Sequence, residues 1–174
     1  MGTKRLSLLL DACTIIHADK VKKWEVLYFT CDIAVPSIVA GKELAPYLDG
    51  ETGEISPIDL EPLIESGKVK KVEAAEIELS AVICAIKEVL GLDDGELDAL
   101  ALMFSRGLPG YSFCTSDSAA IQAAAILELR YRMISLEEVL NLIGHARELP
   151  IQCTKKFLDQ WLVKGSALKI RYGL

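Results

Sequence analysis

Short apolar segments that resemble buried strands alternate along this chain with segments of helical spacing. The first of them, residues 5–10, is continuous and apolar, as in a strand whose two faces are both covered. Because strands that alternate with helices form βαβ units, the pattern predicts an α/β domain with a mostly parallel sheet. Strands are expected at residues 5–10, 32–35, 68–73, 111–115 and 132–134. Helices are expected at residues 14–28, 36–48, 59–65, 76–90, 93–106, 117–131, 136–143 and 154–163.

The composition is that of one globular domain. The chain has 174 residues, of which 51% are apolar, so it is long enough to bury a core and disorder is excluded. No apolar run approaches the ~20 residues that span a bilayer, so we expect no membrane association. The run before Asp11 is short and no small-residue cleavage site follows it. We therefore expect no signal peptide and a cytoplasmic location.

Cysteine and histidine do not form a zinc motif. The five cysteines include no C-x-x-C pair, and the two histidines are not spaced with them as ligands. Cys13, Cys84 and Cys114 stand in apolar surroundings and are expected to be buried as small hydrophobic side chains.

Charge is distributed unevenly along the chain. The net charge of −6 argues against nucleic-acid binding by bulk attraction. Residues 145–174 differ, since they contain six basic and two acidic residues. We therefore predict a main domain, residues 1–144, and a C-terminal helical and basic extension, residues 145–174. The extension fits a phosphate backbone, an acidic partner or a solvated helix face.

Acidic residues stand where expected strands end or helices begin. Asp11 follows the first strand, and Asp117 follows the fourth. Ligands of parallel sheets bind beyond the carboxyl ends of the strands, so both carboxylates are expected at one edge. Glu43 lies in a helix that starts at this edge, and Glu96 and Asp98 lie near the start of another. Converging carboxylates repel each other unless a divalent cation neutralises them, so these acids predict a metal site for phosphoryl chemistry.

Each of these acids also has a purely structural interpretation. Asp11 can cap the helix that follows it, and Asp117 can complement the dipole of its helix. Glu43 can be a solvated surface group. Glu96 and Asp98 are two residues apart, so an ideal helix points them in different directions. Asp93, Asp94 and Glu96 can equally stabilise the start of a helix and have no catalytic role.

Four motifs in this order resemble those of the PIN-domain nucleases, including the toxin ribonucleases of bacterial and archaeal toxin–antitoxin pairs. They are LLLDACTII, VPSIVAGKEL, GELDALAL and FCTSDSAAIQAA, and the resemblance spans residues 5–144. It implies a PIN-like three-layer α/β/α fold and a metal-dependent endoribonuclease that hydrolyses RNA phosphodiester bonds with Mg²⁺ or Mn²⁺. It also implies an antitoxin protein as partner and a homodimer.

The resemblance gives each acid a role. Asp11 would bind the metal and orient the attacking water, and Glu43 would complete the ligand set. Asp98 stands at the common acidic position of the third motif, whereas Glu96 stands at that of a glycine–glutamate subgroup. Asp117 matches the last acid, after the fourth strand.

Other phosphoryl-transfer families fit less well. A phosphatase of the haloacid dehalogenase type also begins with a strand that ends in Asp, but it needs a second Asp two residues later. This chain has Cys13 there. No G-x-x-x-x-G-K-[ST] phosphate loop occurs either.

The remaining alternative is a PIN-fold interaction or scaffold protein with little turnover. Ser116 stands where many relatives carry a second acid, and the segment YRMISLEEVL lacks the glycine that relatives have there. Clustered carboxylates without a cation would destabilise a fold that had no use for them, which favours the nuclease.

Overall fold

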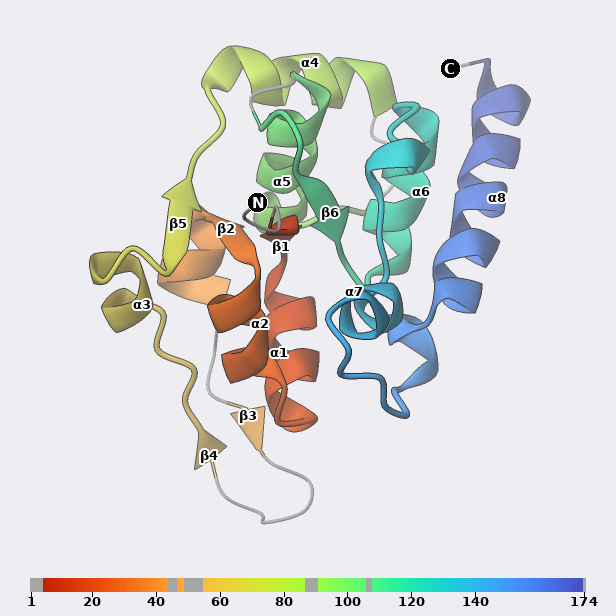
Figure 1. The fold of residues 1–174 in the computed structure, drawn as a ribbon. Helices are drawn as coiled ribbons and strands as arrows, with labels where there is room; N and C mark the ends of the chain where they lie inside the picture. Colours follow the sequence, from red (N-terminus) through yellow and green to blue (C-terminus); the bar gives the residue numbers. More distant parts are fainter. Residues whose placement is uncertain (1–4, 44–46, 49–54, 87–90, 106–107, 174) are drawn as a thin grey trace.

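Four short parallel strands form the central sheet of this protein (Figure 1). The computed structural model describes residues 5–43, 47–48, 55–86, 91–105 and 108–173. The sheet has the order β5-β2-β1-β6, and every neighbouring pair is parallel. This confirms the predicted α/β class and its parallel sheet. The strands are β1 (Ser7–Leu10), β2 (Asp32–Pro36), β5 (Val69–Val72) and β6 (Ser112–Cys114).

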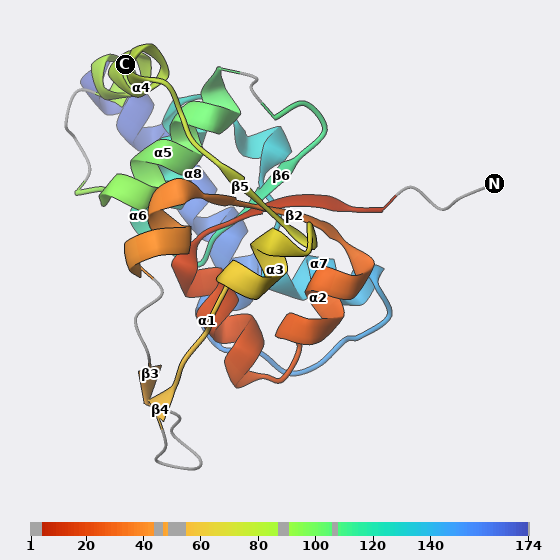
Figure 2. The same cartoon turned by 90° about the vertical axis from the view of Figure 1, so that its left-hand side faces the viewer.

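Helices cover both faces of the sheet, as Figure 2 shows with the sheet seen nearly edge-on. In β1, Leu9 packs into the core on the α5 and α6 side, while Leu8 and Leu10 pack into the core on the α1 and α7 side. All three leucines are fully buried, as a strand covered on both faces requires. One face carries α1 (Ala12–Lys20), α2 (Trp24–Thr30) and α7 (Leu136–Leu142). The other carries α4 (Glu76–Ile86), α5 (Asp94–Phe104) and α6 (Ser118–Ile126).

The single helix expected at residues 14–28 is wrong, because the chain breaks between α1 and α2. Lys22 has a φ of 56°, and the Lys23 N–H returns to the carbonyl of Ala18 at 2.8 Å. An unbroken helix that buried Ile15 would also turn Lys22 toward the core. The break instead turns Trp24 into the core.

The helix expected at residues 36–48 is also wrong in part. Pro36 is the last residue of β2, and the chain then forms a short turn of helix and the π-helix η1 (Val39–Glu43). The chain next forms β3 (Tyr47–Leu48), which pairs antiparallel with β4 (Ile55–Ser56) and projects from the sheet layer (Figure 1). Backbone pairing with β4 therefore replaces the helical hydrogen bonds expected there.

The strand expected at residues 132–134 is reduced to one bridge. Phe113 of β6 pairs in parallel with Met133, and the Ile134 N–H donates to the Phe113 carbonyl at 3.0 Å. A 3-10 turn, η2 (Arg130–Arg132), occupies the residues before this bridge. The short helix α3 (Glu61–Glu65) and the glycine after it, Gly67 with a φ of 72°, confirm the expected helix stop.

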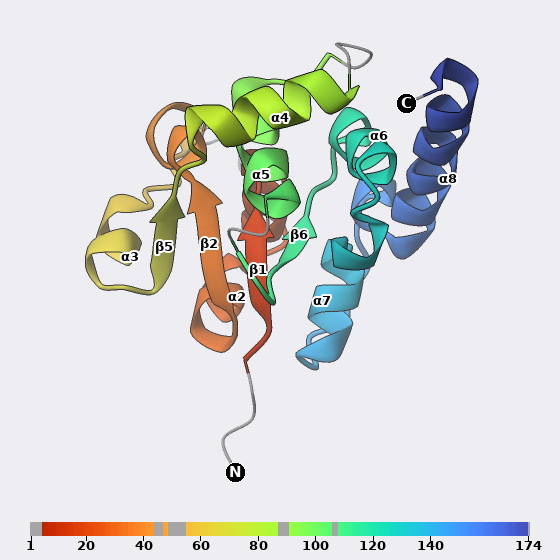
Figure 3. The same ribbon diagram turned by 90° about the horizontal axis from the view of Figure 1, so that it is seen from above.

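The C-terminal helix α8 (Lys155–Tyr172) is longer than the expected 154–163 and packs side by side with α6 (Figures 1 and 3). Its Leu158 and Leu162 form a buried cluster with Ile121 and Ala125 of α6. The preceding 3-10 turn, η3 (Ile151–Cys153), contributes buried Cys153 to the core beneath α1 and α7. Whether residues 1–144 form a domain without this segment stays a prediction.

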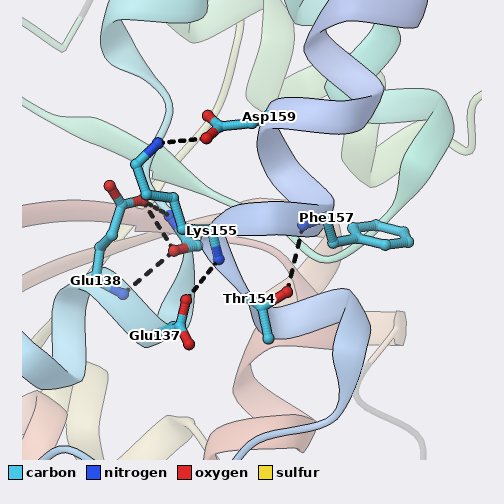
Figure 4. Close-up of polar contacts among 7 residues, drawn as sticks. Glu137, Glu138, Thr154, Lys155, Phe157 and Asp159 are labelled. Carbon is cyan, nitrogen blue, oxygen red and sulfur yellow. Dashed lines mark hydrogen bonds and ion pairs between the residues drawn. The ribbon is translucent and has the colours of Figure 1, made fainter.

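The start of α8 is tied to α7 by side-chain contacts (Figure 4). Thr154 caps the helix by accepting from the Phe157 N–H at 3.3 Å, and Glu137 of α7 accepts from the Lys155 N–H at 2.8 Å. A carboxylate at the first turn satisfies a free donor and complements the helix dipole. The Lys155 ammonium pairs along the helix with Asp159.

Gly165 allows the close approach of α8 to α6. A Cβ at this position would lie 2.5 Å from the Gln122 carbonyl oxygen and 2.8 Å from the Ala125 Cβ. We expect Gly165→Ala to destabilise the fold by roughly 1–3 kcal/mol, because the two helices must separate to admit the methyl group. Thermal or urea unfolding measures the loss. Gly41→Ala is the control, since a Cβ there meets nothing within 4 Å; equal stability of the two variants would contradict the packing described.

Candidate active site

Asp11 lies at the carboxyl end of β1, beside the end of β6. Leu10 and Cys114 are paired across the two strands, so the next residues, Asp11 and Thr115, are neighbours. The Thr115 hydroxyl donates to Asp11 Oδ2, and the Thr14 N–H donates to Asp11 Oδ1 at 2.7 Å. Asp11 is only 3% exposed and is the N-cap of α1. These contacts hold its carboxylate in one orientation.

Asp117 follows β6 and caps α6. Its Oδ1 accepts from the N–H groups of Ala119 at 2.6 Å and Ala120 at 3.1 Å. The Asp117 N–H in turn donates to the Thr115 hydroxyl at 3.0 Å, so this one threonine links the backbone of Asp117 to the carboxylate of Asp11. Asp117 is the N-cap residue itself rather than a residue of the first turn.

Glu96 lies in the first turn of α5, close to Asp117. Asp93 caps this helix by accepting from the Glu96 N–H at 2.8 Å, and Glu96 Oε2 accepts from the Asp93 N–H at 3.1 Å. This reciprocal pair is a capping box, and it fixes the orientation of Glu96 relative to the helix axis. Glu96 is 7% exposed.

Asp117 interacts electrostatically with both Asp11 and Glu96. Burial raises the pKa of Glu96 to about 8, and the next cause is the negative charge of Asp117, which also lies within side-chain hydrogen-bonding reach. Burial likewise raises the pKa of Asp11, against the lowering effect of its hydrogen bonds, and Asp117 adds to the rise. The negative charge of Asp117 therefore repels both Asp11 and Glu96. A cation bound beside Asp117 would relieve both repulsions.

Cys13, on the first turn of α1, lies within the field of the whole group. Burial and then the charges of Asp11, Asp117, Glu96 and Asp93 raise the pKa of its thiol to about 12. Cys13 is nevertheless exposed, so the expectation that it is buried is wrong. The same expectation is wrong for exposed Cys84 and confirmed for Cys114.

Asp98 lies in a different environment, where β2 and β5 end. Its Oδ1 accepts from the Ala74 N–H at 2.7 Å, and the charges of Glu73 and Glu78 add to the burial that raises its pKa. The Ser37 amide is near enough to lower this pKa, yet Oδ2 makes no hydrogen bond in the part of the chain described. Glu96 and Asp98 thus point in different directions, as their spacing predicts.

The structure places Glu43 only by its backbone. It is the last residue of η1, which follows the carboxyl end of β2, but its side chain lies outside the described part. Among the side chains that are described, no group of three or more His, Cys, Asp or Glu is arranged to hold a metal ion. The carboxylates of Asp11, Glu96 and Asp117 nevertheless have the hard oxygen donors that Mg²⁺ and Mn²⁺ prefer.

Several residues of this site were expected from the sequence only as helix caps or not at all: Asp93 does cap α5, whereas Asp117, not Thr115, caps α6. Asp93 adds a fourth negative charge, while Thr14 and Thr115 orient Asp11. Thr14 also donates through its hydroxyl to the Cys114 carbonyl at 2.9 Å, which joins α1 to β6. Threonine directly after a strand and before a capping Asp is a signal that sequence inspection can use. Cys153, whose pKa burial and Asp11 raise to about 12, carries no such signal.

Comparison with known proteins does not assign this chain to a family. No family model matches the sequence, and no curated protein matches it. In the described residues, no helix is both long enough and apolar enough to cross a membrane.

Proposed function

We propose that this chain is a PIN-like, divalent-metal-dependent endoribonuclease whose acidic site hydrolyses RNA phosphodiester bonds. The observation that carries the proposal is that Asp117 lies close to both Asp11 and Glu96, which come from two other elements and have raised pKa values. Perturbed acids that cluster at the ligand-binding edge of a parallel sheet are typical of active sites.

Three side chains would hold Mg²⁺ or Mn²⁺: Asp11, Glu96 and Asp117. Such an ion supplies hydroxide from bound water, holds the scissile phosphate and stabilises the charge that develops on it. Asp11 is the best-oriented ligand, since both its oxygens are fixed by donors and each retains a second lone pair. Asp117 uses Oδ1 to cap α6, and Glu96 uses Oε2 within its capping box. Each therefore retains its other oxygen for a ligand.

The finer parts of the proposal rest on the motif resemblance. These are the RNA substrate, an antitoxin partner, a homodimer, and direct or water-mediated contributions from Glu43 and Asp98. Asp98 would serve the site by holding the backbone after β5, because it accepts from the Ala74 N–H.

One observation favours a second candidate, a PIN-fold interaction protein with little turnover. Asp11, Asp117 and Glu96 all satisfy free N–H groups at helix starts, so each carboxylate has a structural use without any metal. Ser116, at the position of a second acid in relatives, agrees with this candidate.

Manganese binding separates the two candidates. A cation that binds only the native state raises the melting temperature, by roughly 5–10 °C when its concentration is about a hundred times the dissociation constant. We expect this rise with MnCl₂ by differential scanning fluorimetry. We also expect it to be larger at pH 8 than at pH 6, because Glu96 must lose its proton to bind, and its pKa is about 8. A melting temperature that millimolar manganese does not change would favour the interaction protein.

A further inference from the structure

A pocket of about 420 Å³ lies at the edge of the sheet opposite the acidic site. It is formed where the strands begin: Arg5 precedes β1, Lys68 precedes β5 and Tyr111 precedes β6. In Figure 3 this edge is the lower one, from which the strand arrows start, beside α2. The volume lies within the ~300–1,000 Å³ of small-molecule sites.

The lining of this pocket combines cations with aromatic rings, namely Arg5, Lys68, Lys70, Tyr28, Phe29 and Tyr111. One acid, Asp32, also lines it, so the charged lining carries an excess of positive charge on a protein whose net charge is −6. Arg5 and Asp32 form a long, exposed ion pair at 3.9 Å. Such a pair is weak and exchanges easily for a stronger anion.

Lys68 is already positioned by the rings. Its ammonium lies 4.2 Å from the ring centroid of Phe29 and 5.4 Å from that of Tyr28. In the described part of the chain it forms no ion pair with a carboxylate. The ammonium donors that point away from the rings stay available, so an incoming phosphate need not displace a carboxylate first.

Phe29 is the second unusual feature, because it is 50% exposed although it is large and apolar. It lies near the end of α2 with its ring centroid 4.9 Å from that of Tyr28. Exposed aromatic rings beside cations form the surfaces on which single-stranded bases stack. A ligand with one flat ring system and one phosphate uses both parts of this lining.

We propose that this pocket binds a nucleotide, with the base against the aromatic side chains and the phosphate on Arg5, Lys68 and Lys70. The nucleotide can be free or part of a single strand, and both sources share this chemistry. The pocket lies roughly 15 Å from the acidic site, the length of strands of four to five residues. The proposal is independent of the proposed nuclease activity, since binding here requires neither metal nor cleavage.

Two probes distinguish the sources: adenosine monophosphate, followed by calorimetry, and a short fluorescent oligoadenylate, followed by anisotropy. Both are titrated at low salt with EDTA, so that cleavage does not contribute and the outcome does not depend on the nuclease proposal. We expect Lys68→Gln and Phe29→Ala each to raise the dissociation constant at least about tenfold. Asp32→Asn should lower it, because it removes the acid of the pocket. Lys22→Gln is the matched control, because Lys22 is exposed between α1 and α2 and does not line the pocket.

Binding of both probes, or of either alone, with the expected losses supports the proposal and identifies the source. Circular dichroism confirms that the variants are folded; Phe29→Ala changes an exposed side chain and is expected to fold. The proposal is wrong if neither probe binds the wild-type protein, or if the pocket variants bind as the control does. It is also wrong if inorganic phosphate binds as tightly as the mononucleotide and Phe29→Ala has no effect, because the pocket is then a simple anion site.

Discussion

Replacing Asp11 by Asn is expected to abolish manganese-dependent RNA cleavage while leaving the fold intact. Asn keeps the shape of Asp: its Oδ1 still accepts from the Thr14 N–H, and its amide can donate to the Thr115 hydroxyl. The change removes one negative charge from the cluster and, with it, a metal ligand. The loss of activity should exceed the roughly 10–100-fold typical of changes to residues that only support a ligand. Single-turnover cleavage of a labelled RNA measures it.

Two comparisons make this test specific. Asp159→Asn is the matched control, since Asp159 is exposed on α8 and contacts only Lys155 in the described contacts. Glu96→Gln should lose more activity than Asp98→Asn, because Glu96 lies beside Asp117 and Asp98 faces the backbone after β5. Cleavage by purified Asp11→Asn protein at the wild-type rate would place the active site elsewhere.

Glu96→Gln is expected to stabilise the metal-free protein at alkaline pH. The folded-state pKa of Glu96, about 8, lies above the ordinary glutamate value of 4.5, so the folded state holds this proton more tightly than the unfolded state. Stability therefore falls as pH rises from about 4.5 to about 8 and is constant above that range. Gln cannot ionise, and it retains the oxygen that accepts from the Asp93 N–H. The gain above pH 8 is on the order of 4 kcal/mol as an upper value, because water screens the part of the Glu96 carboxylate that is not enclosed.

Thermal unfolding in EDTA, from about pH 5 to about pH 9, measures this difference. The wild-type curve should decline across the window, whereas the Glu96→Gln curve should be flatter. Glu128→Gln is the control, because Glu128 is exposed and Lys169 lowers its pKa, so no stabilisation at pH 8 is expected. A wild-type stability that does not change between pH 5 and pH 8 would contradict the pKa of Glu96 that burial, and then Asp117, raises.

The acids that follow strands could be located from the sequence. Asp11 and Asp117 each come after a short apolar run, and parallel strands that are adjacent in the sheet bring the residues after them together. The sequence alone did not decide between Glu96 and Asp98. Their directions depend on the first residue of α5, which the capping box between Asp93 and Glu96 fixes.

Other features left no local signal. The break between α1 and α2 depends on Lys22 at positive φ, a conformation that favours glycine, so tertiary packing of Trp24 outweighs the local preference. The β3–β4 pair forms between residues that the sequence assigned to a helix and a loop, because pairing between distant residues is not visible in local periodicity. The extent of α8 was underestimated because its apolar contacts with α6 use only one narrow face, including Gly165.

The acidic cluster also contributes to the pKa values of the thiols around it. Cys13, Cys114 and Cys153 all have raised thiol pKa values, for which burial is the largest cause and Asp11 contributes in each. Because the thiolate is the species that oxidants and alkylating reagents attack, these three sulfurs stay protonated and slow to react at neutral pH. Cys13 is protected in this way even though it is exposed. The carboxylates add to the effect of burial on these pKa values, and a cation that neutralised them would remove that added part.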